Sequence, residues 1–107
     1  MGLGMQIVYV GLAGSADLEA QAGVQLLRLG RFDATLSECR LVMELLPSSG
    51  QAPRYGAQLD LLFYGRGLDC AYRRENADLG VAVRTAFDAA EQELASRAKR
   101  AACHDAR

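Results

Sequence analysis

The chain has 107 residues, half of them hydrophobic, so one domain can bury a sizeable core without disulfides or metals. Its formal net charge of -1 gives no indication of a nucleic-acid partner. Three cysteines without a Cys-x-x-Cys pair argue against a zinc site and a disulfide scaffold, and they indicate a reducing cytoplasm. The first residues lack the basic segment of a signal peptide, and their apolar run is too short to span a membrane.

The N-terminal part of the chain predicts a strand followed by an amphipathic helix. Residues Met5 to Val10 form a β-branched and aromatic run closed by Gly11, which is typical of a strand. Ser15 stands where a helix N-cap is expected, and Gly30 marks the expected end of the helix. Apolar residues recur between them in steps of three and four, which predicts one buried helical face. They are Leu18, Ala22, Leu26 and Leu29, and Phe32 is a further candidate just after Gly30.

Three strands are predicted in the middle of the chain. Residues 35–46 and 55–64 alternate between apolar and polar side chains, and this period of two is typical of half-buried strands. The segment 47–53 has the Pro, Ser and Gly content of a loop. Gly65-Arg66-Gly67 predicts a tight hairpin turn. A shorter strand is expected over 68–72, ended by the charged run that begins at Arg73.

A long amphipathic helix is predicted over residues 77–100. Asn76 is expected as its N-cap and Asp78 as an acid in its first turn, where both suit the helix dipole. Its apolar stripe predicts that Phe87 lies near the centre of the interface between this helix and the sheet. An isolated amphipathic helix is unstable in water, so the strands upstream must supply the surface that covers it.

The predicted order β-α-β-β-β-α places the protein in the α+β class. The economical arrangement is a four-stranded mixed sheet with two helices packed on one face and the other face open to solvent. The first β-α-β unit is expected to join parallel strands by a right-handed crossover. We expect a single domain over 1–107, with an ordered core of about 5–100 and a short loose C-terminal tail.

Three segments resemble the hibernation-promoting-factor family, whose members are also called ribosome-associated inhibitors or ribosomal-subunit-interface proteins. The segments are CRLVMEL (39–45), YGAQLDLLFYGRGL (55–68) and DLGVAVRTAFDAAEQEL (78–94). The resemblance is to the short form of the family and covers roughly residues 5 to 100, with AVRTAFDAA as its most specific part. The element order expected from periodicity agrees with the fold that this resemblance implies.

The resemblance implies a factor that binds the small ribosomal subunit rRNA in the channel for messenger and transfer RNA. Such a factor inhibits translation by idle ribosomes in the cytoplasm. The resemblance implies no enzyme activity, cofactor, metal or small-molecule substrate. The chain departs from the family in its slightly acidic balance and in the loop SSGQAPR (48–54), which in one family branch is His-rich. These departures favour an alternative: a divergent member that acts as a protein-interaction module or homodimer without RNA binding.

Arginine supplies 11 of the 12 basic residues, and it suits bidentate phosphate contacts, although GC-rich coding explains the bias equally well. The candidate RNA-binding residues lie off the apolar faces or at the ends of elements. They are Arg28, Arg31, Arg40, Arg73, Arg74, Arg84, Arg97, Lys99 and Arg100. Complementing a helix dipole explains several of them as well, and Arg84 can pair with Asp88 one turn later. No catalytic residue is predicted, because Cys103-His104-Asp105 falls in the expected loose tail.

Overall fold

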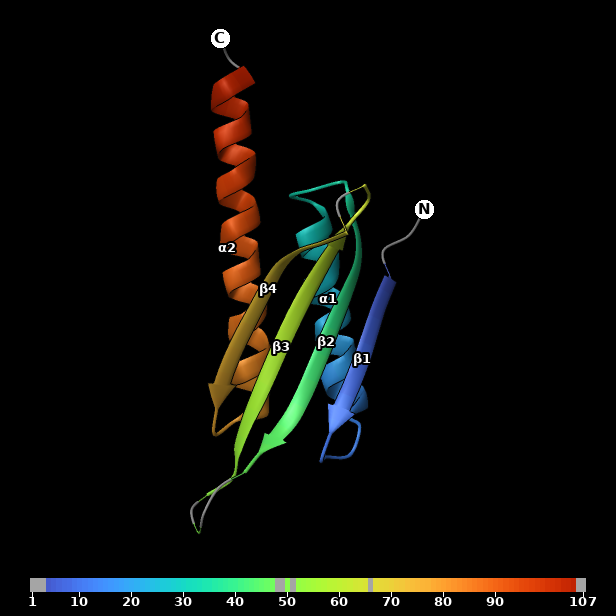
Figure 1. The fold of residues 1–107 in the computed structure, drawn as a ribbon, viewed down its shortest axis with the longest axis vertical. Coiled ribbons are helices and arrows are strands. Elements are labelled where there is room, and N and C mark those ends of the chain that lie inside the picture. Colours follow the sequence, from blue (N-terminus) through green and yellow to red (C-terminus); the bar gives the residue numbers. More distant parts are fainter. Residues whose placement is uncertain (1–3, 48–49, 51, 66, 106–107) are drawn as a thin grey trace.

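The computed structural model describes residues 4–47, 50, 52–65 and 67–105. In chain order the elements are β1 (Gly4–Val10), α1 (Ala16–Gly30), β2 (Leu36–Leu46), β3 (Arg54–Phe63), β4 (Gly67–Asn76) and α2 (Leu79–Asp105). The strands form one sheet in the order β1-β2-β3-β4, in which β1 is parallel to β2 and the other pairs are antiparallel. Both helices lie on one face of this sheet (Figure 1), so the predicted α+β fold is confirmed.

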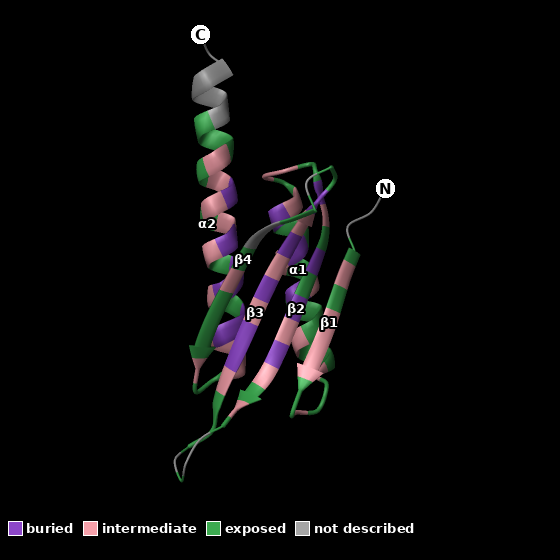
Figure 2. Ribbon diagram, viewed as in Figure 1, coloured by how far each residue is buried: buried purple, intermediate pink, exposed green. Residues whose placement is uncertain are grey.

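The core lies between the sheet and the two helices. Buried and less buried residues alternate along β2 and β3 (Figure 2), because successive side chains of a strand point to opposite faces. Cys39, Leu41 and Met43 of β2 are fully buried, and Phe87 of α2 is fully buried against the same core. The predicted assignment of the apolar faces is therefore correct for both strands and for the long helix.

A small polar cluster fixes the start of α1. The Ser15 hydroxyl accepts a hydrogen bond from the backbone N–H of Leu18 at 3.3 Å, which satisfies one of the free donors at the helix N-terminus. The hydroxyl of Tyr9 accepts from the backbone N–H of Ser15 at 3.1 Å and donates to the Glu19 carboxylate at 2.9 Å. The end of β1 and the first turn of α1 are therefore held together, and Ser15 is the predicted N-cap.

The last strand is longer than the sequence predicts. β4 continues past residue 72 to Asn76, because the segment from Arg73 to Asn76 keeps its antiparallel register with residues 58 to 55 of β3. Charged side chains are tolerated there, since β4 is an edge strand and Arg73 and Glu75 are exposed. The expected end of the strand at Arg73 is therefore wrong.

The start of α2 also differs from the prediction. Asp78 is the N-cap, with its carboxylate accepting from the backbone N–H of Val81 at 3.3 Å. The Asn76 side chain instead accepts from the backbone N–H of Asp78 at 2.9 Å, and the first turn of the helix holds no acid. A pattern of two polar residues did not specify which one caps the helix.

The C-terminal part of α2 extends beyond the sheet (Figure 1). Leu94 is its last buried residue among the described side chains, and the helix continues to Asp105, past the predicted end at residue 100. The segment after Leu94 is about 16 Å long at the rise of an α-helix. No helix in the described ranges is long and apolar enough to cross a membrane. The predicted hairpin turn falls on Gly65 and Gly67, which both have positive φ, while Arg66 lies outside the described residues.

Candidate nucleic-acid interface

The two helices carry five of the nine candidate residues toward one end of the molecule. α1 and α2 run in the same direction behind the sheet (Figure 1), so their C-terminal ends point the same way. Arg28 lies in the last turn of α1, where the partial negative charge of the free carbonyl groups stabilises a cation, whereas Arg97, Lys99 and Arg100 lie before the last turn of α2. We call these five residues the helix-end cluster: Arg28, Arg31, Arg97, Lys99 and Arg100.

The helix-end cluster keeps an excess of positive charge. Arg28 lies 3.0 Å from Glu91 and so links α1 to α2. Arg97 and Arg100 share one carboxylate, that of Glu93, each at 3.9 Å. Arg31 and Lys99 form no ion pair within the described part of the chain. Exposed ion pairs contribute only about 0–1 kcal/mol, so the paired arginines can also exchange a carboxylate for a phosphate.

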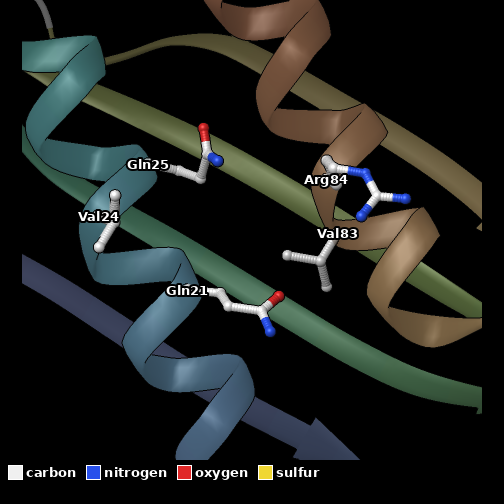
Figure 3. Close-up of a pocket in the computed structure, with 5 residues that line it drawn as sticks. All are labelled: Gln21, Val24, Gln25, Val83 and Arg84. Atoms are coloured by element: carbon white, nitrogen blue, oxygen red, sulfur yellow. The ribbon is translucent and has the colours of Figure 1, made fainter.

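Arg84 lies in a separate hollow between the two helices. It is exposed and forms no ion pair with a described residue, so the alternative pairing with Asp88 is not present. In Figure 3 the side chains of Gln21 and Gln25 extend from α1 toward α2, where Val83 faces them and the guanidinium of Arg84 extends away from α1. The hollow is therefore walled by aliphatic and amide groups, with a cation at its rim.

Arg73 lies on the open face of the sheet and is already neutralised. Its guanidinium is 2.7 Å from the Glu44 carboxylate and 3.3 Å from that of Glu75. The side chain crosses β3 above Gly56, where a Cβ atom would come within 3.0 Å of the guanidinium Nη2. The hydrogen bond to Glu44 is the main cause of a raised pKa at Arg73, which strengthens its charged form. Arg73 is therefore a structural cation that bridges β2, β3 and β4.

The remaining two candidates lie apart from the helix-end cluster. Arg40 is exposed on the open face of the sheet, on the opposite side of β2 from Cys39, as the strand phase predicts. Its partner in the β3 register is Asp60, which accepts a hydrogen bond from Gln58 at 3.2 Å. Arg74 lies on the helix side of the β4 edge and donates to the backbone carbonyl of Arg73 at 2.7 Å. The nine candidates thus form one cluster and four separate positions.

The balance of charge differs between the two sides of the molecule. On the open face, the cations Arg40, Arg54 and Arg73 lie among four carboxylates. Those acids are Glu38, Glu44, Asp60 and Glu75. Because like charges repel a phosphate backbone, this face is a poor surface for RNA. The outer surface of the helix layer carries six cations, the helix-end cluster and Arg84, beside five acids. Those acids are Asp17, Glu19, Asp88, Glu91 and Glu93. Because Arg31, Arg84 and Lys99 form no ion pair with a described residue, this surface is the better candidate interface.

The described residues offer no obvious metal site or reactive thiol. No group of three or more His, Cys, Asp or Glu side chains within the described ranges is placed to hold a metal ion. Burial raises the pKa of the Cys39 thiol from 9.0 to about 12, so this cysteine is protonated and unreactive at neutral pH. Cys70 and the Cys103-His104-Asp105 segment have side chains outside the described set.

Sequence reasoning missed the two glutamines of the hollow between the helices. Gln21 and Gln25 carry no charge and belong to no motif, so neither stands out among ordinary helix residues. A signal was present in Val24 and Leu27, which fall outside the apolar stripe of α1 and are 59% and 66% exposed. Aliphatic residues off the buried stripe of a helix indicate a second contact surface.

These features define a class of small α+β proteins in which two helices cover one face of a four-stranded mixed sheet and the other face is bare. A ribosomal subunit interface protein from Coxiella burnetii has this fold, with a TM-score of 0.71 and 14% identity over 89% of this chain and 97% of that one. The N-terminal domain of Protein Y from Thermus thermophilus matches with a TM-score of 0.65 and 24% identity, covering 88% of this chain and 98% of the domain. No protein-family model and no curated protein sequence matches the chain. The structural matches establish the fold that the sequence resemblance implied.

Proposed function

We propose that this protein is a ribosome-associated factor of the hibernation type. It binds rRNA of the small ribosomal subunit in the channel for messenger and transfer RNA, and it inhibits translation by idle cytoplasmic ribosomes. The observation that carries the proposal is the fold shared with a ribosomal subunit interface protein over 97% of that chain. The protein acts by occupying its site, without a catalytic step, cofactor or small-molecule substrate.

The outer surface of the helix layer is the proposed RNA contact. Phosphate groups are bound by cations that are not held by internal carboxylates, and Arg31, Arg84 and Lys99 meet this condition. The other members of the helix-end cluster, Arg28, Arg97 and Arg100, lie at exposed or half-exposed helix positions. Arg40, Arg73 and Arg74 are left out of the proposed contact, because they lie on the sheet rather than on the helix layer.

A second function rests on a different observation, the exposed aliphatic residues of α1. Val24 and Leu27 are 59% and 66% exposed, and β1 and β4 are both edge strands. These features suit a protein-interaction module or a homodimer that does not bind RNA. Light scattering of the purified protein distinguishes the two functions. A stable dimer that Leu27→Glu converts to a monomer, together with no binding to subunits, supports the second function.

Co-sedimentation with purified small ribosomal subunits tests the first function. Single-stranded nucleic acids give a slope of about -0.7 per neutralised phosphate in a plot of log affinity against log salt. For about three phosphates, raising the salt concentration fourfold then weakens binding by roughly 20-fold. Binding that does not respond to salt, or no binding of the folded protein at low salt, contradicts the proposal.

A matched pair of variants tests the proposed surface. Arg31→Glu with Lys99→Glu reverses two unpaired cations of the helix-end cluster, and we expect it to weaken subunit binding roughly tenfold or more. Arg40→Glu with Arg54→Glu makes the same change in net charge on the sheet, where both residues are exposed. Equal losses in the two double variants would mean that net charge, and not the helix layer, controls binding.

A further inference from the structure

The hollow between α1 and α2 has mainly apolar walls, and one of its lining residues, Gln25, carries a buried oxygen without a described donor. It encloses about 190 Å³ and is lined by Gln21, Val24 and Gln25 of α1 and by Val83 and Arg84 of α2. Figure 3 shows Gln21, Gln25 and Val83 extending into the space between the helices, while the guanidinium of Arg84 lies over α2, on the side away from α1. The hollow lies on the outer surface of the helix layer, which is the surface proposed above to meet RNA.

The side-chain oxygen of Gln25 is buried and has no hydrogen-bond donor among the residues that the structure describes. Buried carbonyl oxygens are nearly always paired, because removing such a group from water without a partner is unfavourable. The neighbouring described side chains supply no bond to it, although Gln21 and Arg84 both carry N–H groups in the same hollow. The Gln25 oxygen is therefore an acceptor whose hydrogen-bonding capacity is not used within the described part of the chain.

Arg84 and Val24 add two further requirements for a ligand. Arg84 is exposed without a carboxylate partner in the described chain, so an anion is its natural ligand. Val24 is 59% exposed and Val83 is almost completely buried, so the walls of the hollow are aliphatic. A ligand that suits all of these groups has an apolar flat body, an N–H donor and an attached negative charge.

We infer that this hollow binds an unstacked base of single-stranded RNA that carries an exocyclic amino group, as adenine and cytosine do. The Gln25 side chain rotates so that its oxygen faces the hollow and accepts from the amino group, the base packs against Val24 and Val83, and Arg84 binds an adjacent phosphate. Proteins commonly read splayed-out RNA bases by such edge contacts, and glutamine is suited to adenine. An aliphatic side chain of a protein partner would fill the hollow but leave the Gln25 oxygen without a donor. The inference rests on the proposed RNA-binding function and names what that surface recognises.

Short RNA hexamers that differ by one functional group test the inference. Fluorescence anisotropy compares oligoadenylate with the same hexamer built from purine riboside, which lacks only the amino group. A second pair compares oligocytidylate with its analogue lacking the 4-amino group. We expect the amino-bearing member of at least one pair to bind roughly three- to tenfold more tightly, as for one hydrogen bond. Equal affinity within both pairs overturns the inference.

Three variants locate the effect in the hollow. Gln25→Leu keeps the size of the side chain and removes the unpaired oxygen, so we expect it to abolish the discrimination while its melting temperature is unchanged or higher. Arg84→Gln is expected to weaken both members of a pair equally, because phosphate is common to them. Gln6→Leu is the control, since Gln6 is exposed on the open face of the sheet. Discrimination that survives Gln25→Leu places the amino contact elsewhere and overturns the assignment.

Failure of this inference can be separated from failure of the proposed function. Wild-type protein that sediments with small subunits but does not distinguish the hexamers retains the function and loses the base site. Protein that distinguishes the hexamers but does not sediment with subunits retains the base site and loses the proposed ribosomal role. Gln6→Leu should still sediment with subunits, because it changes neither the helix-end cluster nor the hollow.

Discussion

The open face of the sheet and the outer surface of the helix layer both carry arginine, but in different electrostatic states. On the sheet, Arg73 is held between Glu44 and Glu75 at 2.7 and 3.3 Å. On the helices, Arg31 and Arg84 form no ion pair with a described residue. The same residue type therefore stabilises strand packing on one side and remains available to a ligand on the other. A count of arginines says little about binding until the acids around each one are known.

The covered face of the sheet provides the largest expected effect. Phe87→Ala removes a fully buried aromatic ring from the interface between α2 and the sheet, and we expect a loss of about 3–5 kcal/mol in the free energy of unfolding. Urea denaturation measures this loss. The control Leu27→Ala changes a residue that is 66% exposed, so its effect should stay within about 0.5 kcal/mol. A loss under about 1 kcal/mol for Phe87→Ala would contradict the packing of α2.

Cys39 makes the covered face sensitive to alkaline pH. Its pKa is about 12 in the folded protein against 9.0 as the ordinary value, so the folded state holds this proton more tightly. The contribution to stability is complete below pH 9 and is lost as the pH rises toward 12, by about 1.4 kcal/mol per pH unit. Urea denaturation between pH 8 and 10.5 should show a steeper fall for the wild-type protein than for Cys39→Ala. Parallel curves would mean that the thiol is more accessible than its burial indicates.

Neutralising one arginine on each surface sharpens the comparison between them. Arg73→Gln breaks the contacts to Glu44 and Glu75, and we expect it to lower the free energy of unfolding by about 0.5–1 kcal/mol. Arg84→Gln removes no ion pair, so its effect on stability should be within the experimental error of denaturation measurements. The Arg73 effect should shrink at high salt, because exposed ion pairs are screened. Equal effects of the two variants would remove the distinction between paired and unpaired arginines.

Releasing Arg73 from its acids gives the smallest expected change. Glu44→Gln with Glu75→Gln leaves Arg73 unpaired on the open face and raises the net charge of the protein by two. If RNA meets the helix layer, affinity for small ribosomal subunits should rise by no more than about twofold, through the general charge effect alone. A tenfold rise in co-sedimentation affinity would move the RNA contact to the open face of the sheet.

Periodicity predicted the elements because it reports directly on which side chains share a face. The alternation in residues 35–46 places Cys39 on the covered face and Arg40 on the open face, and both positions are as predicted. The end of β4 could not be predicted in the same way. The charged run from Arg73 to Glu75 has the composition of a loop, yet pairing with β3 extends the strand through it. Hydrogen bonds to a neighbouring strand override local propensity at a sheet edge.

The sequence by itself determined the α+β order, the buried faces and the concentration of basic residues toward the helix C-termini. These follow from local spacing, since neighbours in a helix or strand are separated by only a few residues. The tertiary structure alone decided which cations are free. Arg73 and Glu44 are 29 residues apart in the chain and meet only because β3 lies between their strands. Gln25 and Arg84 likewise line one hollow only because α1 packs beside α2. Sequence periodicity does not predict such contacts, because it reports only on residues within one helix or strand.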